Sequence, residues 1–188
     1  TMPLSKHCHT NDTLVKVIED CKLDAIIIGS DAVAQHHPLL SRINFPTRTL
    51  LSITKMTSDR YFPNPFWGTF AENLKKPIPM AILSASSQDS NYKLFASSLK
   101  KEMWQQLQKF TYISARDQWT QEMYVAISNG KLHVEVTPDP VFAFNANCSE
   151  IIPTKNDILE KYHLPEDYLL LSFLNSQTVS LQWQEGFK

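Results

Sequence analysis

Two short runs of apolar residues constrain the fold of this chain more than any other feature. They are "AIII" at 25–28 and "AIL" at 81–83, and neither has polar residues at alternate positions. Uninterrupted runs of this kind are typical of strands that are buried on both faces, as in the interior of a parallel sheet. Small polar residues follow both runs, at 30–31 after Gly29 and at Ser84. We therefore expect two buried strands that end in polar side chains.

Segments with helical periodicity separate these strands from further ones. An apolar stripe at 14–21 predicts a short helix before the first strand, and apolar residues four apart over 95–107 predict a longer helix after the second. Further strands are expected at 110–114 and 131–136, with another helix between them. Strands that alternate with helices in this way predict an α/β fold, a Rossmann-like parallel sheet with helices on both faces.

Turn and capping signals refine this outline. Two prolines and a glycine within 61–68 predict a long, aromatic-rich loop region over 38–79, with "TLLSI" at 49–53 as a candidate strand. The sequence "SARD" matches a capping box, which predicts that Ser114 caps the following helix and pairs with Asp117.

The length of the chain predicts one domain and part of another. Its 188 residues, 43% hydrophobic, suffice for one core and a fraction of a second. We expect residues 1–150 to form a Rossmann-like amino-side domain without its first strand. Residues 151–188 are expected to hold a connection and a strand at 167–174, the first strand of a second, truncated domain.

Composition excludes several classes of function. Lys and Arg total 18 and Asp and Glu total 19, so no basic surface for nucleic acid is expected. Three scattered cysteines and the absence of a long apolar segment favour a cytoplasmic protein without a transmembrane segment. The histidines at 7–9 and 36–37 lack metal-ligand spacing, and phosphate-binding glycine motifs are missing. We expect no metal and no nucleotide cofactor, and oligomeric state is not readable from these patterns.

Five segments in this order resemble the polysaccharide pyruvyl transferase family. They are "LDAIIIGSDAV", "PFWG", "AILSASS", "YISARDQWTQEM" and "VEVTPDPVF", within about residues 4–142. The resemblance implies two Rossmann-like domains that face a cleft, as in GT-B glycosyltransferases. It also implies transfer of a pyruvyl group from phosphoenolpyruvate, as donor substrate, to a sugar hydroxyl of a glycan or lipid-linked precursor in polysaccharide biosynthesis. Because the family's main donor-binding basic residues would lie beyond Lys188, we expect the 188-residue chain alone to be inactive.

The chain departs from the family next to its first strand. Ala34 and Gln35 stand where members of the family typically carry tryptophan and asparagine. The loss of this aromatic platform marks either a different acceptor or a loss of catalysis. Trp67 is a candidate for the missing sugar-binding surface, and its alternative is an aromatic residue folded onto the core.

Polar residues at the strand ends are the candidate site. Ligands of open α/β sheets bind outside the carboxyl ends of the strands, where Gly29, Ser30, Ser84 and Ser86 are expected to bind substrate. Asp31 is the candidate catalytic base, which accepts a proton from the attacking hydroxyl. The structural alternative is that Ser30 or Asp31 caps a helix.

Two charged residues complete the predicted site. Arg116 follows a strand and opens a helix, so its guanidinium is a candidate for binding the anionic donor. Asp139, between two prolines, has a fixed backbone and is a candidate substrate-binding residue. The alternatives are a solvated arginine and a purely structural turn.

Two other functions stay open. A GT-B-like glycosyltransferase would be revealed by thermal stabilisation with a sugar nucleotide where phosphoenolpyruvate has no effect. A non-catalytic glycan-binding module is favoured by Ala34 and Gln35.

Overall fold

The computed structural model describes residues 5, 8, 10–47, 50–53, 55, 57–143 and 151–167. The chain divides into two compact units, Thr1–Phe142 and Ala143–Lys188. The first unit contains the predicted sheet and its helices.

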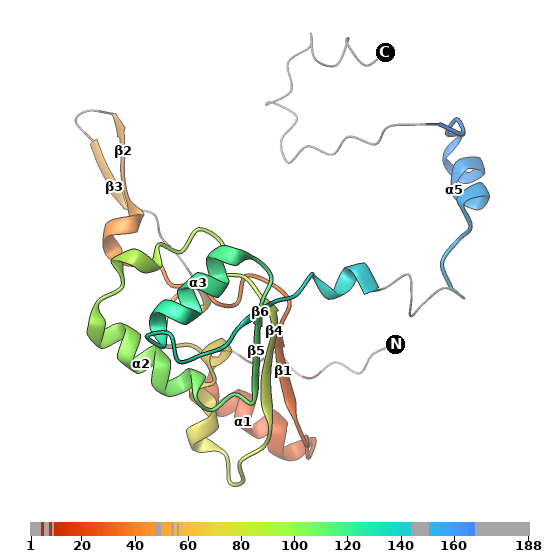
Figure 1. Ribbon diagram of the computed structural model, residues 1–188. Helices are drawn as coiled ribbons and strands as arrows, with labels where there is room; N and C mark the ends of the chain where they lie inside the picture. The colour runs from red at the N-terminus through yellow and green to blue at the C-terminus, as the bar shows by residue number, and fades with distance from the viewer. Residues whose placement is uncertain are drawn as a thin grey trace. The chain divides into compact units, whose positions relative to one another are not determined.

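A four-stranded parallel sheet forms the centre of the first unit (Figure 1). Its strands, in spatial order, are β1 (Ile26–Gly29), β4 (Met80–Ala85), β5 (Tyr112–Ala115) and β6 (Glu135–Val136). The predicted α/β class and parallel sheet are confirmed. Because the strands are parallel and follow one another in space, their carboxyl ends meet at one edge of the sheet.

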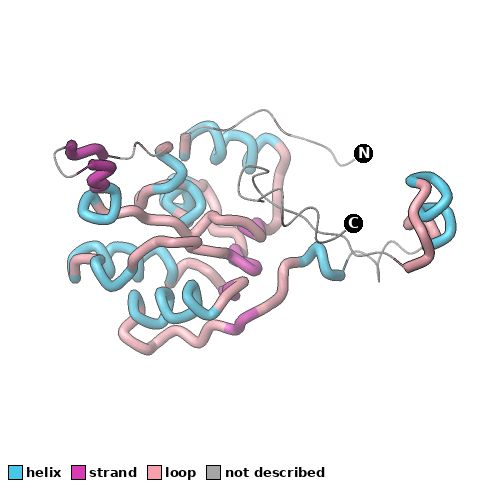
Figure 2. The backbone as a smooth tube through the Cα atoms, turned by 90° about the horizontal axis from the view of Figure 1, so that it is seen from above, coloured by secondary structure: helices cyan, strands magenta, loops and turns pink. Residues whose placement is uncertain are grey.

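Three α-helices accompany the strands, as their periodicity predicts. They are α1 (Asn11–Asp20), α2 (Ser97–Leu107) and α3 (Gln118–Ile127). The side chain of Thr10 caps α1, and Asn129 and Gly130 follow α3 with positive φ angles. Helices α2 and α3 lie side by side along the sheet (Figure 2).

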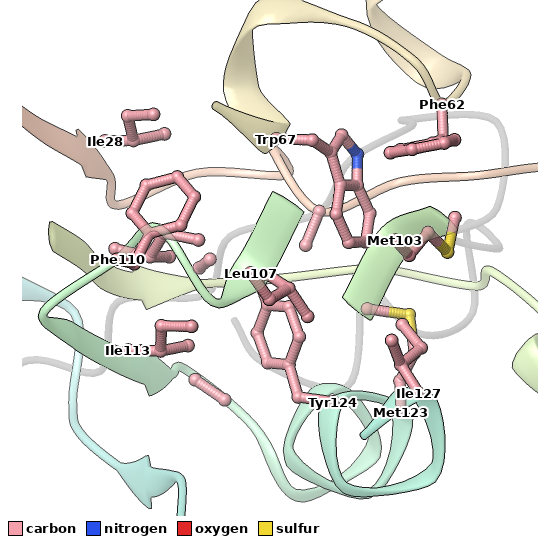
Figure 3. Close-up of a cluster of buried hydrophobic side chains, with 14 of the residues drawn as sticks. Ile28, Phe62, Trp67, Met103, Leu107, Phe110, Ile113, Met123, Tyr124 and Ile127 are labelled. Atoms are coloured by element: carbon pink, nitrogen blue, oxygen red, sulfur yellow. The ribbon is translucent and has the colours of Figure 1, made fainter. Parts of the chain in front are cut away.

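The core lies between the sheet and these helices (Figure 3). It is made of buried apolar side chains from strands, helices and the segment before β4, among them Ile28, Phe62, Trp67, Ile82, Met103, Leu107, Phe110, Ile113, Met123, Tyr124 and Ile127. The apolar runs that predict the strands therefore supply one wall of the core, and the helix stripes supply the other.

The opposite side of β1 is not buried among the described residues. Ile27 is 70% exposed, whereas its neighbour Ile28 is buried. The prediction of burial on both faces is therefore wrong for this strand. The reason is positional, because β1 is an edge strand of the described sheet and Ile27 points away from the core.

The segment between Pro38 and Pro79 has more structure than the predicted loop. An antiparallel hairpin joins β2 (Ile43–Thr47) and β3 (Leu50–Ile53), so the candidate strand is confirmed. Short 3₁₀ helices occupy much of the rest, at Leu39–Arg42, Ser58–Arg60, Pro65–Trp67 and Thr69–Asn73. Two further 3₁₀ helices lie at Tyr92–Leu94 and Pro140–Ala143. Proline at the first position of one such turn shows why prolines here do not exclude local order.

The second unit contains helix α5 (Lys155–Tyr162). Thr154 and Asp157 form its capping box. The predicted strand at 167–174 lies outside the described residues, apart from Asp167. In the described part of the chain, no helix combines the length and the apolar character that crossing a bilayer requires.

Candidate active site at the carboxyl edge of the sheet

Backbone hydrogen bonds join the loops that follow β1, β4 and β5. The Ser86 amide donates to the Asp31 carbonyl at 3.0 Å, and the Ala34 amide donates to the Ser86 carbonyl at 3.2 Å. The Arg116 amide donates to the Ala85 carbonyl at 2.8 Å. These bonds tie the loops after β1, β4 and β5 into one edge, as the parallel sheet predicts.

Arg116 connects this edge across its width. Its Nη1 donates to the Ser30 carbonyl at 3.4 Å and to Asp139 Oδ2 at 3.1 Å. The Arg116 and Asp139 side chains are 31% and 25% exposed, so the ion pair is reachable from solvent. The structure thus brings together three predicted site residues, with Arg116 86 positions from Ser30 and 23 positions from Asp139 in the chain.

The Asp139 carboxylate is held on both oxygens. The Val141 amide donates to Oδ1 at 3.1 Å, while Arg116 occupies Oδ2. The Val141 hydrogen bond, and after it the Arg116 guanidinium, lower the pKa of Asp139 below its ordinary value. Asp139 is therefore ionised at neutral pH and pairs with a charged arginine.

The Arg116 guanidinium keeps part of its donor capacity. Nη1 makes both of its hydrogen bonds, and the described residues provide no partner for Nη2 or Nε. A planar guanidinium with two free donors can bind a carboxylate or phosphate in a bidentate manner. The edge thus presents a cationic group suited to an anion.

Asp31 and Ser30 do not cap a helix. The first helical turn after β1 begins at Leu39, and its N-cap is Pro38. The Asp31 carbonyl accepts hydrogen bonds from the Val33 and Ser86 amides. Asp31 is exposed, and it follows Ser30, whose carbonyl Arg116 contacts. The capping alternative is therefore wrong for both residues.

Ser84 lies beneath the edge and is buried. Its hydroxyl is within 2.9 Å of Thr137 Oγ1 and also donates to the Pro138 carbonyl at 2.9 Å. The hydroxyl thus faces the protein interior. In this structure Ser84 holds the loop after β6, and its expected contact with substrate stays a prediction without geometric support.

Ser86 and Asp117 form a second internal pair. Ser86 Oγ donates to Asp117 Oδ2 at 2.8 Å, and Asp117 Oδ1 accepts from the Thr120 amide at 2.8 Å. Asp117 is therefore the N-cap of α3, and the predicted capping box that begins at Ser114 is wrong. The reason is that β5 extends to Ala115, which places Ser114 inside the strand.

Trp67 lies in the core, so the alternative of an aromatic residue folded onto the core is confirmed. It is 1% exposed, and its ring meets Phe62 and Tyr124 edge-on at centroid distances of 5.6 and 6.2 Å (Figure 3). Its ring therefore offers no open face to a sugar in this structure. Ala34 and Gln35 are buried as well, so the residues that depart from the family pattern do not form part of the surface.

Gly29 has a structural role that the sequence did not reveal. Its φ of +144° disfavours side chains, and a Cβ at this position would lie 2.0 Å from the Leu83 carbonyl oxygen. The close approach of β1 and β4 therefore requires glycine here. Its expected contact with substrate stays a prediction.

A hollow lies beside the edge. A cavity of about 860 Å³ runs along β1 between α1 and the 58–70 segment, and it reaches Gly29 and Val33. Arg116 and Asp139 do not line it, so the charged pair lies on the open edge of the sheet. No cluster of three metal-ligating side chains occurs among the described residues.

Sequence reasoning missed two polar residues at this edge, Ser114 and Thr137. Thr137 Oγ1 donates to Ser114 Oγ at 2.8 Å, across 23 positions of the chain. The sequence predicts Ser114 only as a helix cap and assigns no role to Thr137, so no local pattern indicates that they pair. Only the pairing of β5 with β6 brings them together.

One of three comparisons with known proteins gives a match. A search of curated proteins and a search of solved structures find no match. The family model for polysaccharide pyruvyl transferase matches residues 3–181. This match spans nearly the whole chain and includes every strand and loop that forms the edge. The chain therefore belongs to the polysaccharide pyruvyl transferase family.

Proposed function

We propose that this chain takes part in the transfer of a pyruvyl group from phosphoenolpyruvate to sugar hydroxyls of a glycan or glycan precursor. The observation that carries the proposal is the position of Arg116 at the carboxyl edge, where its Nη2 and Nε have no partner among the described residues. Arg116 donates to the Ser30 carbonyl, and Asp31 is the next residue in the chain. Family membership supplies the reaction class, and the edge supplies an anion-binding group beside a carboxylate.

The chemistry assigns separate tasks to these two residues. Phosphoenolpyruvate carries a carboxylate and a phosphate, and Arg116 binds one of these groups through its free donors. Asp31 accepts the proton of an attacking sugar hydroxyl. Holding donor and acceptor together at the edge lowers the barrier through proximity and electrostatic stabilisation.

The reaction balances with two hydroxyls of one acceptor. The first sugar oxygen bonds to C2 of the enolpyruvyl group, and the methylene carbon gains a proton and becomes a methyl group. The second oxygen then bonds to the same carbon as the C–O bond to phosphate breaks. Asp31 passes the proton of the first hydroxyl to the methylene carbon, and the proton of the second hydroxyl leaves with the phosphate. The products are a pyruvate ketal and inorganic phosphate.

Substitutions that remove each group test this function in the intact protein. Asp31→Asn and Arg116→Gln are each expected to lower phosphate release from phosphoenolpyruvate at least tenfold, about 1.4 kcal/mol in the barrier. The thermal midpoint should change little, because Asp31 is exposed and the Arg116 ion pair is reachable from solvent, where charges contribute little to stability. Asp20→Asn, an exposed carboxylate at the end of α1, is the matched control and should keep full activity.

Two results would contradict the proposal. One is full activity in either variant. The other is thermal stabilisation of the wild-type protein by a sugar nucleotide but not by phosphoenolpyruvate, which would favour a glycosyltransferase.

A further inference from the structure

We propose that Asp139 is a positioning residue, which fixes the orientation of the Arg116 guanidinium, and not a substrate contact. The inference rests on the proposed function for its consequence in catalysis. Its structural part concerns only this chain's own residues.

The position of Asp139 is determined by its own loop. Pro138 and Pro140 restrict the backbone on both sides, and the Val141 amide holds Oδ1 at 3.1 Å. The remaining oxygen, Oδ2, is aimed at Arg116 Nη1. With one oxygen held by the main chain and the other by arginine, both oxygens of this carboxylate already have donors that fix its orientation.

A buried hydroxyl network anchors the start of the same loop. Thr137 Oγ1 contacts Ser84 Oγ at 2.9 Å and Ser114 Oγ at 2.8 Å, and the Ser84 amide donates to Ser114 Oγ at 2.9 Å. Ser84 Oγ also donates to the Pro138 carbonyl. These bonds join the ends of β4 and β5 to Thr137, two positions before Asp139. The sheet therefore holds the start of the loop that carries the Asp139 carboxylate.

The consequence for Arg116 is a restrained side chain. An unrestrained arginine loses rotamer freedom when it binds an anion, and this loss weakens binding. Here Nη1 is already held by Asp139 and by the Ser30 carbonyl, while Nη2 and Nε remain available. Asp139 therefore prepares the guanidinium for a bidentate ligand without blocking it.

Nuclear magnetic resonance of the arginine side chains tests the positioning without any substrate. The chain has four arginines, and Arg116→Lys identifies the Arg116 signals by their loss. We expect slow rotation of the Arg116 guanidinium, seen as separate Nη signals, in the wild-type protein. Asp139→Asn should average these signals, while the control Glu135→Gln, an exposed charge on β6, should leave them separate.

Binding of phosphoenolpyruvate tests the catalytic consequence. In the intact protein, Asp139→Asn should raise the Kd and the KM for phosphoenolpyruvate about tenfold, the effect of one charge-assisted hydrogen bond. The KM for the acceptor should stay unchanged, a split that a general loss of structure would not produce. Thr137→Val, which removes the hydroxyl but keeps the side-chain volume, should change both readouts in the same direction by less.

The outcomes separate this inference from the proposed function. Averaged Arg116 signals in the wild-type protein would overturn the positioning role, and this measurement needs no variant to fold. Unchanged signals in Asp139→Asn would overturn it as well. If Asp139→Asn averages the signals but the wild-type protein binds no phosphoenolpyruvate, the positioning stands and the proposed function fails.

Discussion

Gly29 shows how a single residue sets the distance between two strands. Its neighbour across the sheet, Leu83, approaches so closely that even a methyl group would overlap the carbonyl oxygen. A side-chain rearrangement cannot relieve this overlap, because the obstructing atom belongs to the backbone of Leu83. A glycine that reads as part of a binding motif is thus also required by packing.

Substitution by alanine measures this requirement. Gly29→Ala is expected to lower the free energy of unfolding by roughly 3 kcal/mol or more, through backbone strain of about 1–3 kcal/mol and the added overlap. Gly130→Ala is the matched control, because its φ is also positive at +76° but a Cβ there meets nothing within 4 Å. Chemical denaturation of both variants checks the difference, and equal losses would refute the packing argument.

At the scale of the element, the start of α3 is coupled to the loop after β4. Asp117 caps the helix with one carboxylate oxygen and accepts the Ser86 hydroxyl with the other. Ser87 extends the contact, because its amide donates to Thr120 Oγ1 at 2.8 Å. One residue therefore stabilises a helix and fixes a loop of the candidate site.

Removal of the cap should destabilise the first unit. Asp117→Ala is expected to lower the free energy of unfolding by about 1–2 kcal/mol, because the Thr120 amide and the Ser86 hydroxyl lose their acceptor. Asp117→Asn should cost less, since asparagine is itself a good N-cap. Urea denaturation distinguishes the two variants. If Ser114→Ala behaved as the cap mutant and Asp117→Ala were silent, the assignment of the cap would be wrong.

At the scale of the whole first unit, His36 joins three segments that are distant in sequence. Its amide donates to Ser90 Oγ at 3.0 Å, and its Nδ1 accepts the Phe62 amide at 3.1 Å. Its ring meets Tyr61 and Phe95 edge-on. Burial, and after it the charges of His37 and Arg42, lower the pKa of His36 from 6.5 to about 4.

This lowered pKa predicts acid-dependent stability. The unfolded chain takes up a proton on His36 near pH 6.5 and the folded chain only near pH 4, so stability is lost as the pH falls through this window. We expect the free energy of unfolding to be roughly 1–2 kcal/mol lower at pH 5 than at pH 7. His37, whose pKa burial also lowers, adds to the same trend.

The comparison with His36→Asn isolates this residue, because asparagine Oδ1 can accept the Phe62 amide but does not titrate. Denaturation of both proteins at pH 5 and pH 7 should show a shallower pH dependence for the variant. The same slope in both proteins would mean that other groups carry the effect.

The sequence by itself determined the class of fold and the edge on which to look for the site. Uninterrupted apolar runs and helical stripes are local patterns, and they predicted β1, β4, α1 and the parallel sheet. The rule for the carboxyl ends of parallel strands then placed Asp31 and Arg116 at one edge. These inferences succeeded because each depends on residues within one or two turns of each other.

Only the tertiary structure decided what each polar or aromatic residue contacts. Trp67 is buried, the Ser84 hydroxyl faces inward, and Asp139 pairs with Arg116. Each of these outcomes depends on the strand order and on the depth of the core. The contact of Asp139 with Arg116 spans 23 positions of the chain, and that of Ser84 with Pro138 spans 54. The physical reason is that hydrogen bonding and burial depend on distances in space, and local patterns of residue type carry no information about which distant partner lies within reach.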